Sequence, residues 1–242
     1  MGVSEKYIAQ IARFDPSKGI PEVVESYVKF HERFTASVKN QSPPKLLICG
    51  HGSVDDPDGS VIYDAVVSHI EESLAHLADQ ICVVRLGSSD QVLNALLSKT
   101  KVALQLSTQE GFEVKVSEAI HKGVPVIATR AGGIPLQVAD QENGFLVDVG
   151  DTDSVAQHLY DLCTDDKLYQ RMSQFALKNV CDEVSTVGNT LNWLYLASTL
   201  TGPKGLKPNG RWINDLARNE AGQPYTEGEP MLKRAIDLEK MG

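Results

Sequence analysis

The sequence predicts an α/β protein, a Rossmann-like parallel sheet with helices on both faces. Apolar runs of strand length recur along the chain, and segments with the apolar spacing of helices separate them. Strands that alternate with helices in this way form βαβ units, in which the strands pair in parallel. The chain has 242 residues, of which 42% are hydrophobic, so it is long enough to bury a sizeable core.

Six runs have the length and composition of strands: YIAQIA at 7–12, KLLICG at 45–50, ICVVRL at 81–86, VALQLS at 102–107, PVIAT at 125–129 and GFLVDV at 144–149. The first helix is predicted over 21–34, because proline stands in its first turn and apolar residues recur at Val24, Tyr27, Val28 and Phe34. Further helices are expected near 61–78, 90–99, 115–122, 151–163, 166–180 and 187–200. The helix at 151–163 opens on Asp151, a residue that favours the helix N-cap.

The composition changes at residue 201, which divides the chain into a Rossmann-like domain over 1–200 and a tail over 201–242. The tail is rich in glycine, proline and other turn residues. Two shorter stretches interrupt it: RWINDLAR, and LKRAIDLEK at 232–240, which has a helical pattern.

Charge and composition exclude several kinds of partner. The net charge of −9 argues against a nucleic-acid surface, which needs clustered Lys and Arg. No run approaches the roughly 20 apolar residues that span a bilayer, and the N-terminus has no signal pattern, so a cytoplasmic protein is expected. The histidines and cysteines show no metal-ligand spacing, and no metal is predicted.

A dinucleotide cofactor is also not expected. Gly50 and Gly52 follow the second strand, but Asp55 occupies the third glycine position of the G-x-G-x-x-G fingerprint, and no helix is predicted to begin there.

Two cations follow the first strand, where a parallel sheet binds its ligands. Arg13 and Lys18 flank a turn with a proline, Gly19 allows close backbone approach, and a helix begins directly afterwards. Cations beside a helix N-terminus form an anion site, most naturally for phosphate. The alternative is a solvated turn in which Arg13 and Lys18 pair with nearby carboxylates.

A second polar group follows the fourth strand. Glu110 comes directly after the strand, Gly111 and Phe112 leave amides at a helix start, and Glu118 lies about two turns into the helix. Lys115 in the first turn adds a cation for a phosphate. A carboxylate at a helix start can accept hydrogen bonds from sugar hydroxyls. The two glutamates lie on one continuous segment, which does not suit a glycosidase pair. In the alternative interpretation Glu110 caps the helix and Glu118 is solvated.

Three of these stretches together resemble the C-terminal half of a retaining glycosyltransferase with the GT-B fold. They are Arg13 with Lys18 and Gly19, the pair Glu110 and Glu118, and the run Ala131-Gly132-Gly133 after the fifth strand. The resemblance covers residues 5 to about 200. Within this superfamily the sequence most resembles the fungal trehalose phosphorylases. The segments that carry this resemblance are ARFDPSKGIPEVVESY, LLICGHGSVDDPDGS, LQLSTQEGFEVKVSEA and, in the tail, LKPNGRWINDLARNEAGQPY.

This resemblance implies reversible conversion of α,α-trehalose and phosphate into glucose and α-glucose 1-phosphate with retention of configuration. Arg13, Lys18 and Glu110 would be catalytic, the first two by holding the phosphate. The implied substrate-binding residues are Gly19, Gly111, Phe112, Val114, Lys115 and Glu118. No cofactor is implied, because charge and positioning supply most of the catalysis.

One position departs from the wider transferase pattern. Transferases commonly have the sequence EGFG at the start of this helix, and here Glu113 replaces the second glycine. Its size and charge are expected to exclude a nucleotide diphosphate and admit inorganic phosphate or a sugar phosphate. Glu118, which would meet the ribose in nucleotide-sugar relatives, then has no obvious partner in a phosphorylase.

The resemblance also implies a missing partner, because a GT-B cleft lies between two Rossmann-like halves and this sequence matches the second. The chain is therefore expected to need an N-terminal domain, to be inactive alone, and to pack its tail on that domain. Without the partner, Trp212 and neighbouring apolar residues favour homo-oligomers. Two alternatives remain, a trehalose-forming transferase that uses nucleotide sugars and a non-catalytic subunit that binds sugar phosphates.

Overall fold

The protein was analysed as a computed structural model, which describes residues 6–50, 58–87, 89–203, 205–207 and 210–232. Its chain divides into two compact units, one ending at Lys178 and one beginning at Asn179. Each unit is described by itself.

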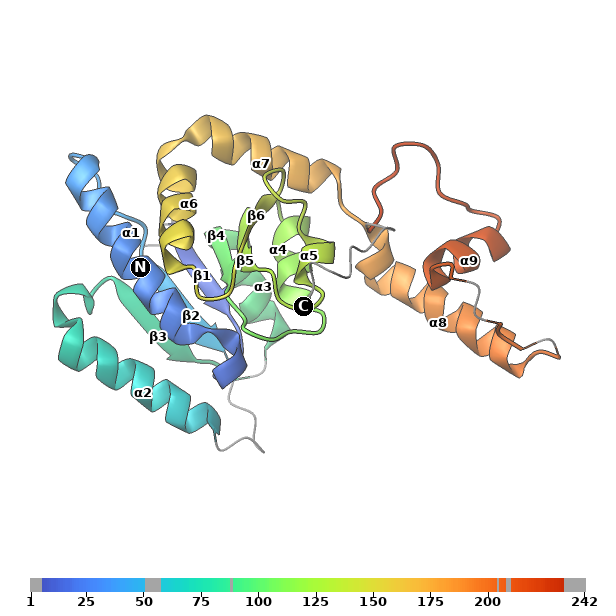
Figure 1. The fold of residues 1–242 in the computed structure, drawn as a ribbon, viewed down its shortest axis with the longest axis horizontal. Coiled ribbons are helices and arrows are strands. Elements are labelled where there is room, and N and C mark those ends of the chain that lie inside the picture. Colours follow the sequence, from blue (N-terminus) through green and yellow to red (C-terminus); the bar gives the residue numbers. More distant parts are fainter. Residues whose placement is uncertain (1–5, 51–57, 88, 204, 208–209, 233–242) are drawn as a thin grey trace. The chain divides into compact units, whose positions relative to one another are not determined.

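The first unit contains a parallel sheet that, over the described residues, has six strands in the order β3-β2-β1-β4-β5-β6 (Figure 1). Their bounds are β1 Tyr7–Ile11, β2 Leu46–Gly50, β3 Ile81–Arg85, β4 Thr100–Gln105, β5 Val126–Thr129 and β6 Gly144–Val147. Every neighbouring pair is parallel. All the strands expected from the sequence are confirmed, and so is the Rossmann-like fold class.

Alternation along the strands gives the sheet two buried faces. In β1, Ile8 belongs to one apolar cluster, whereas Tyr7 and Ala9 belong to the other. Successive strand residues point to opposite faces, so a strand buried on both sides must be apolar at nearly every position. This requirement explains why β1 and β2, which are buried at every position, appear in the sequence as largely apolar runs.

Helices cover both faces of the sheet, with α1, α2 and α6 on one side and α3, α4 and α5 on the other (Figure 1). Their bounds are α1 Ile20–Ser37, α2 Asp58–Ser73, α3 Asp90–Lys99, α4 Val114–His121, α5 Ile134–Gln137, α6 Thr152–Thr164 and α7 Asp166–Lys178. Short 3-10 turns η1 Pro16–Lys18 and η2 Ala75–Leu77 complete this unit.

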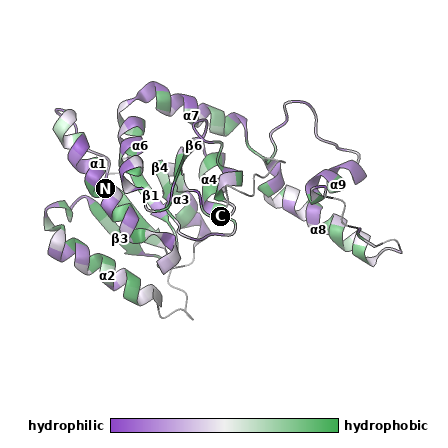
Figure 2. Ribbon diagram, viewed as in Figure 1, coloured by the Kyte–Doolittle hydropathy of each residue, from purple (hydrophilic) through white to green (hydrophobic). Residues whose placement is uncertain are grey.

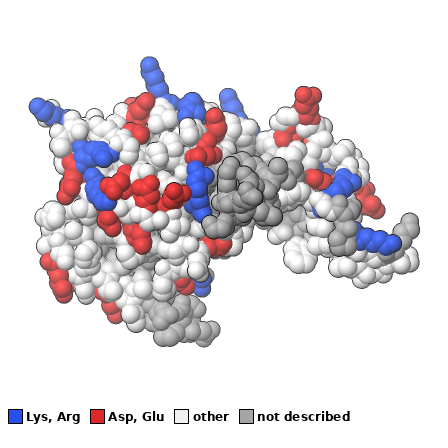
Figure 3. Space-filling view, viewed as in Figure 1, with Lys and Arg blue, Asp and Glu red and all other residues white. Residues whose placement is uncertain are grey.

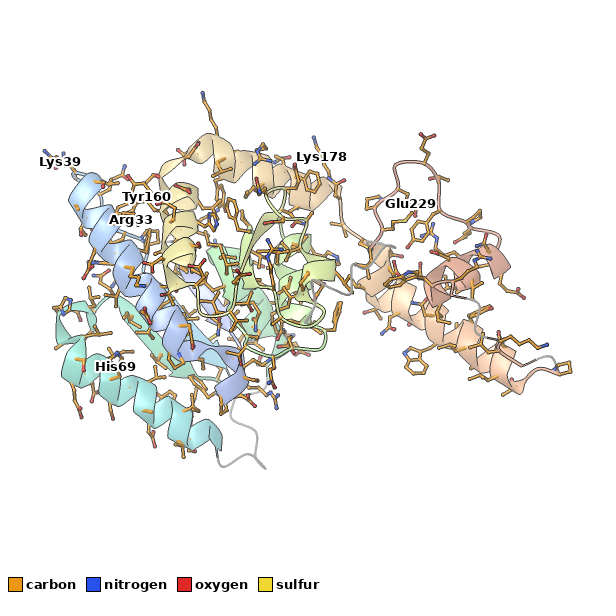
Figure 4. All side chains as sticks on the ribbon, viewed as in Figure 1. Arg33, Lys39, His69, Tyr160, Lys178 and Glu229 are labelled. Atoms are coloured by element: carbon orange, nitrogen blue, oxygen red, sulfur yellow. The ribbon has the colours of Figure 1, made fainter. Side chains whose placement is uncertain are left out.

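The contact between α1 and α6 is aromatic at its core and polar at its edge. Phe34 meets the ring of Tyr160 with 6.5 Å between centroids, and the exposed Arg33 donates to the side chain of Gln157. Figure 4 labels Arg33 and Tyr160 at this junction. Buried aromatic side chains therefore fix α1, and with it the start of α1 at the edge of the sheet.

The second unit consists of η3 Asp182–Val184, α8 Thr186–Thr201 and α9 Ile213–Glu220. Helix α8 carries many apolar residues, as Figure 2 shows, and Trp193 and Leu194 are 67% and 63% exposed. In α9, Asn214 donates to Asn192 of α8 and accepts from Tyr225. The packing boundary lies before α8, because α8 packs on α9 and η3. The boundary expected from the sequence, at residue 201, lies after that helix.

Two features of the sequence lie outside the described residues. They are the segment 51–57 after β2 and most of the helix expected over 232–240. On the face that Figure 3 shows, described Lys and Arg side chains are interspersed with Asp and Glu. Among the described helices, none combines the length and the apolar character needed to cross a bilayer.

Candidate functional site at the switch point of the sheet

The candidate site lies where the strand order reverses, between the carboxyl ends of β1 and β4. The chain proceeds outward from β1 through β2 to β3, and β4 then returns to the other side of β1. Helices leave the two central strands in opposite directions, which opens a crevice between their ends. The segment after β1 carries Arg13 and Lys18, and the segment after β4 carries Glu110 and Glu113.

Lys18 is the centre of this site. Its side chain is only 9% exposed, and its Nζ makes an ion pair with Glu110 and lies 3.0 Å from Oε2 of Glu113. The turn that presents Lys18 is fixed by Asp15, whose carboxylate accepts from the amide of Ser17 at 2.8 Å. The structure thus brings together Lys18 and Glu110, which the sequence analysis singled out on separate strands.

Burial and charge act in opposite directions on these three groups. Burial alone would lower the pKa of the Lys18 ammonium, but the hydrogen bonds and charges of Glu110 and Glu113 outweigh it and raise that pKa. Burial also opposes ionisation of Glu110, but the hydrogen bond and charge of Lys18 outweigh it, so the pKa of Glu110 is lowered. For Glu113, burial dominates and raises the pKa, with a further contribution from the charge of Glu110.

Glu113, rather than Glu110, caps helix α4. Its Oε1 accepts from the amide of Lys115 at 3.1 Å, while its own amide donates to Gln137 at 3.1 Å. The alternative in which Glu110 caps this helix is therefore wrong. One carboxylate oxygen of Glu113 caps the helix and the other faces Lys18, so the side chain is held at both oxygens.

The two glutamates of the sequence pattern do not converge on one point. Glu110 faces Lys18, whereas Glu118 makes an ion pair of 2.7 Å with Lys115 on its own helix. Glu118 is 41% exposed, so the interpretation of this residue as solvated is closer to the structure than a shared site with Glu110.

Glycines set the spacing between the segments that form the site. Gly19 has a φ of 60°, and a Cβ there would come within 1.9 Å of the carbonyl oxygen of Leu106. Gly132 has a φ of 52°, and its Cβ would come within 1.5 Å of the carbonyl oxygen of Glu110. The amide of Gly133 donates to Gly111 at 2.7 Å. The run after β5 therefore supports the segment that carries Glu110.

Four buried polar side chains that the sequence analysis missed hold the site together, namely Gln10, Gln105, Ser107 and Gln137. Gln10 donates to the carbonyl of Lys18 at 2.6 Å and accepts from the amide of Leu106 at 3.1 Å, which ties the end of β1 to the end of β4. Gln105 donates to Ser107 and to Glu113. A glutamine inside each of two apolar strand runs was the available signal, because a buried amide needs partners.

An open cavity of about 330 Å³ lies at this site. Among the residues singled out from the sequence, Arg13, Lys18, Glu110, Phe112, Glu113, Val114 and Lys115 line it. Arg13 is half exposed and lies 3.9 Å from Asp15. Phe112 and Val114 are 45% and 52% exposed, which places apolar surface beside the charged groups.

A larger polar cavity of about 520 Å³ shares Asp90 and Lys115 with the first and extends between α3 and α4 to Glu118 and His121. Among the described residues, no group of three or more His, Cys, Asp or Glu side chains could hold a metal ion. The chemistry that these side chains offer is anion binding by the cations and hydroxyl binding by carboxylates and amides.

The relationship of the chain to known proteins follows from its sequence over this same region. The family model described as glycosyl transferases group 1 matches residues 2–179. The chain belongs to this family. The matched segment ends within one residue of the first structural unit, so this glycosyl transferase group 1 domain is the unit that contains the sheet and the candidate site.

Two fungal proteins are similar to this domain and its tail together. The trehalose phosphorylase of Pleurotus pulmonarius is 55% identical over 238 residues, which cover 96% of this chain and 32% of that protein. The trehalose phosphorylase of Grifola frondosa is 54% identical over 233 residues, with 96% and 32% covered. The chain thus spans about a third of the length of these curated relatives.

Solved structures show the same fold. The C-terminal domain of a glycosyl transferase group 1 family protein from Francisella tularensis has a TM-score of 0.60 at 23% identity. The alignment covers 73% of this chain and 85% of that one. This glycosyl transferase group 1 domain therefore has the fold of the C-terminal half of a GT-B enzyme, as the sequence predicted.

Proposed function

We propose that this chain is the phosphate- and glucosyl-binding half of a retaining trehalose phosphorylase, which converts trehalose and phosphate into glucose and α-glucose 1-phosphate. The single observation that carries the proposal is the position of Lys18. Its ammonium lies at the switch point of the sheet, it lines the cavity there, and two carboxylates that line the same cavity hold it. The similarity to two fungal trehalose phosphorylases supports the choice of substrates.

In this proposal Arg13 and Lys18 bind the phosphate at the start of α1. Lys18 is oriented by buried contacts, whereas the exposed Arg13 closes the site from solvent. Glu110 would accept hydrogen bonds from the glucosyl hydroxyls, and the amides of Gly111 and Phe112 would donate hydrogen bonds to them. An anion held beside the sugar stabilises positive charge that develops at the anomeric carbon, which is the main catalytic contribution of such a site.

The proposal includes a second domain, which would bind the other glucose unit and complete the cleft. The apolar residues of the second unit, including the exposed Trp193 and Leu194, would pack on that domain. The chain alone is then expected to release no glucose 1-phosphate from trehalose. Steady release by the chain alone would contradict this part of the proposal.

The experiment that tests the binding proposal is a titration of the isotopically labelled chain with α-glucose 1-phosphate and, separately, UDP-glucose. The amides of Gly19 and Gly111 report on the two sides of the cavity. Shifts at both amides with the sugar phosphate support the proposal, and the Arg13→Ala variant should weaken them. Arg130→Ala is the matched control, because Arg130 also follows a strand end and pairs with an aspartate, Asp140, at 3.1 Å.

One observation favours a second candidate function. The larger cavity beyond Lys115 reaches Glu118 and offers more room than a free phosphate needs. If UDP-glucose saturates these shifts at a lower concentration than the sugar phosphate, the chain is instead part of a transferase that uses a nucleotide sugar.

A further inference from the structure

Lys18 has one carboxylate partner more than it needs for neutralisation. Glu110 and Glu113 both make ion pairs with it, and the side chains of all three are at most 13% exposed. When all three groups are ionised, the cluster carries a net charge of −1. This negative cluster lies in the place where the proposed function requires an anion.

The other charged groups around Glu113 do not reverse this sign. Arg13, Lys115 and Asp90 also line the cavity, from the segment after β1 and from helices α4 and α3. Lys115 makes an ion pair of 2.7 Å with Glu118, and Arg13 is half exposed beside Asp15. A dianion against Lys18 would therefore lie beside two carboxylates, whose like charge would repel it.

The two carboxylates differ in how well their surroundings support a negative charge. Glu110 accepts from the hydroxyl of Ser107 at 3.2 Å and from the amide of Gly111 at 3.3 Å, in addition to Lys18. Glu113 has one oxygen committed to the cap of α4, and its other oxygen accepts from Gln105 at 3.3 Å in addition to Lys18. Burial raises its pKa, whereas the pKa of Glu110 is lowered despite its burial. A proton that enters the cluster therefore goes to Glu113.

We propose that Glu113 takes up one proton from solvent when the site binds a tetrahedral dianion, and that its neutral carboxyl then donates a hydrogen bond to an anion oxygen. Lys18 keeps its ion pair with Glu110 and gives up the contact with Glu113 for the anion. The proton returns to solvent when the anion leaves. This role rests on the proposed function, since it specifies how the phosphate site neutralises its own charge.

Glu113 then discriminates between anions by the hydrogen bond it makes. A carboxyl group that is held by the helix cap at one oxygen can donate from the other only to an acceptor directly beside Lys18. A phosphate or phosphomonoester with a free terminal oxygen satisfies this donor. The sequence position that departs from the transferase pattern is thus a specificity-determining residue for a terminal phosphate.

Sulfate is the probe that tests the proposal, because it is a tetrahedral dianion whose own charge does not change between pH 5.5 and about 8. Isothermal titration calorimetry is run at each pH in two buffers of different ionisation enthalpy, so that the difference in heat counts the protons bound. We expect uptake of up to one proton per sulfate, and an affinity that falls by up to about tenfold per pH unit once Glu113 ionises in the free protein.

The Glu113→Gln variant should bind sulfate with no proton uptake and with little dependence on pH, since the amide donates a hydrogen bond without titrating. Glu142→Gln is the matched control, an exposed glutamate paired with Arg171. His121→Gln tests the imidazole that lines the neighbouring cavity, and it should leave the uptake unchanged.

Three results would overturn the proposal. Sulfate binding by the unchanged chain without proton uptake at any pH refutes the role of Glu113 and leaves the proposed function intact. Uptake that persists in Glu113→Gln, or that disappears in His121→Gln, assigns the proton to another group. Absence of sulfate binding at every pH overturns both this role and the proposed phosphate site.

Discussion

The contact between Gly132 and the segment that carries Glu110 leads to the sharpest stability prediction. Gly132 has a φ of 52°, and an added Cβ would lie 1.5 Å from the carbonyl oxygen of Glu110, so Gly132→Ala must both strain the backbone and displace that segment. Left-handed backbone costs a residue with a side chain about 1–2 kcal/mol. Forcing an extra carbon into packed surroundings adds about 1–3 kcal/mol. We expect Gly132→Ala to lose about 2–5 kcal/mol of unfolding free energy.

Gly150→Ala is the matched control. Gly150 has a φ of 83°, but its added Cβ would meet nothing within 4 Å, so only the backbone strain applies. This variant should lose about 1–2 kcal/mol and bind sulfate like the unchanged chain. Gly132→Ala should bind sulfate more weakly, because the carbonyl that moves belongs to Glu110.

Urea unfolding of both variants measures the difference. Circular dichroism reports both structural units, whereas fluorescence reports the second unit alone, because the two tryptophans are Trp193 and Trp212. The destabilisation should appear in the dichroism and leave the fluorescence transition in place. Equal losses in Gly132→Ala and Gly150→Ala would refute the steric argument.

Three further predictions concern buried polar groups. Lys18→Met leaves two buried carboxylates without their cation, so urea unfolding at pH 7.5 should show a loss of about 3 kcal/mol, and acidification should recover part of it as a carboxylate takes up a proton. Gln10→Leu leaves the carbonyl of Lys18 and the amide of Leu106 without this partner, and should cost about 2–4 kcal/mol in the same assay. His158 stacks on Phe145 with 3.9 Å between ring centroids, and burial lowers its pKa, so it contributes stability that is lost as the pH falls below its ordinary pKa of 6.5. His158→Phe should therefore flatten the dependence of the urea midpoint on pH between 5 and 7.

Each of these predictions has an outcome that contradicts it. If Lys18→Met loses the same unfolding free energy at pH 5 and at pH 7.5, protonation of a carboxylate does not relieve the destabilisation. A loss below 1 kcal/mol in Gln10→Leu would mean that solvent replaces the amide. An unchanged slope in His158→Phe would assign the acid sensitivity to other groups.

The sequence alone determined the elements and the class of fold. All six strands were visible as largely apolar runs. In β1, β2, β5 and β6 every residue is buried, so these strands have no solvent-facing positions, whereas the edge strand β3 exposes Cys82 and Arg85. Helix α3 was predicted with its observed bounds, since its amphipathic pattern and the cap by Ser89 are local properties. The sequence also placed Lys18 and Glu110 at strand ends, and both line the cavity.

Only the tertiary structure decided which charges meet. The cluster joins Lys18 to Glu110 and Glu113 across 92 and 95 residues of sequence, and the contact depends on β4 lying beside β1. No local pattern predicts that pairing, because Glu113 caps a helix while it also faces a cation from another strand. A similar reason explains why Gln10 was missed, since the amide of Leu106 reaches it only because β4 lies beside β1. Local periodicity determines which elements form, whereas long-range strand order determines which side chains share a buried site.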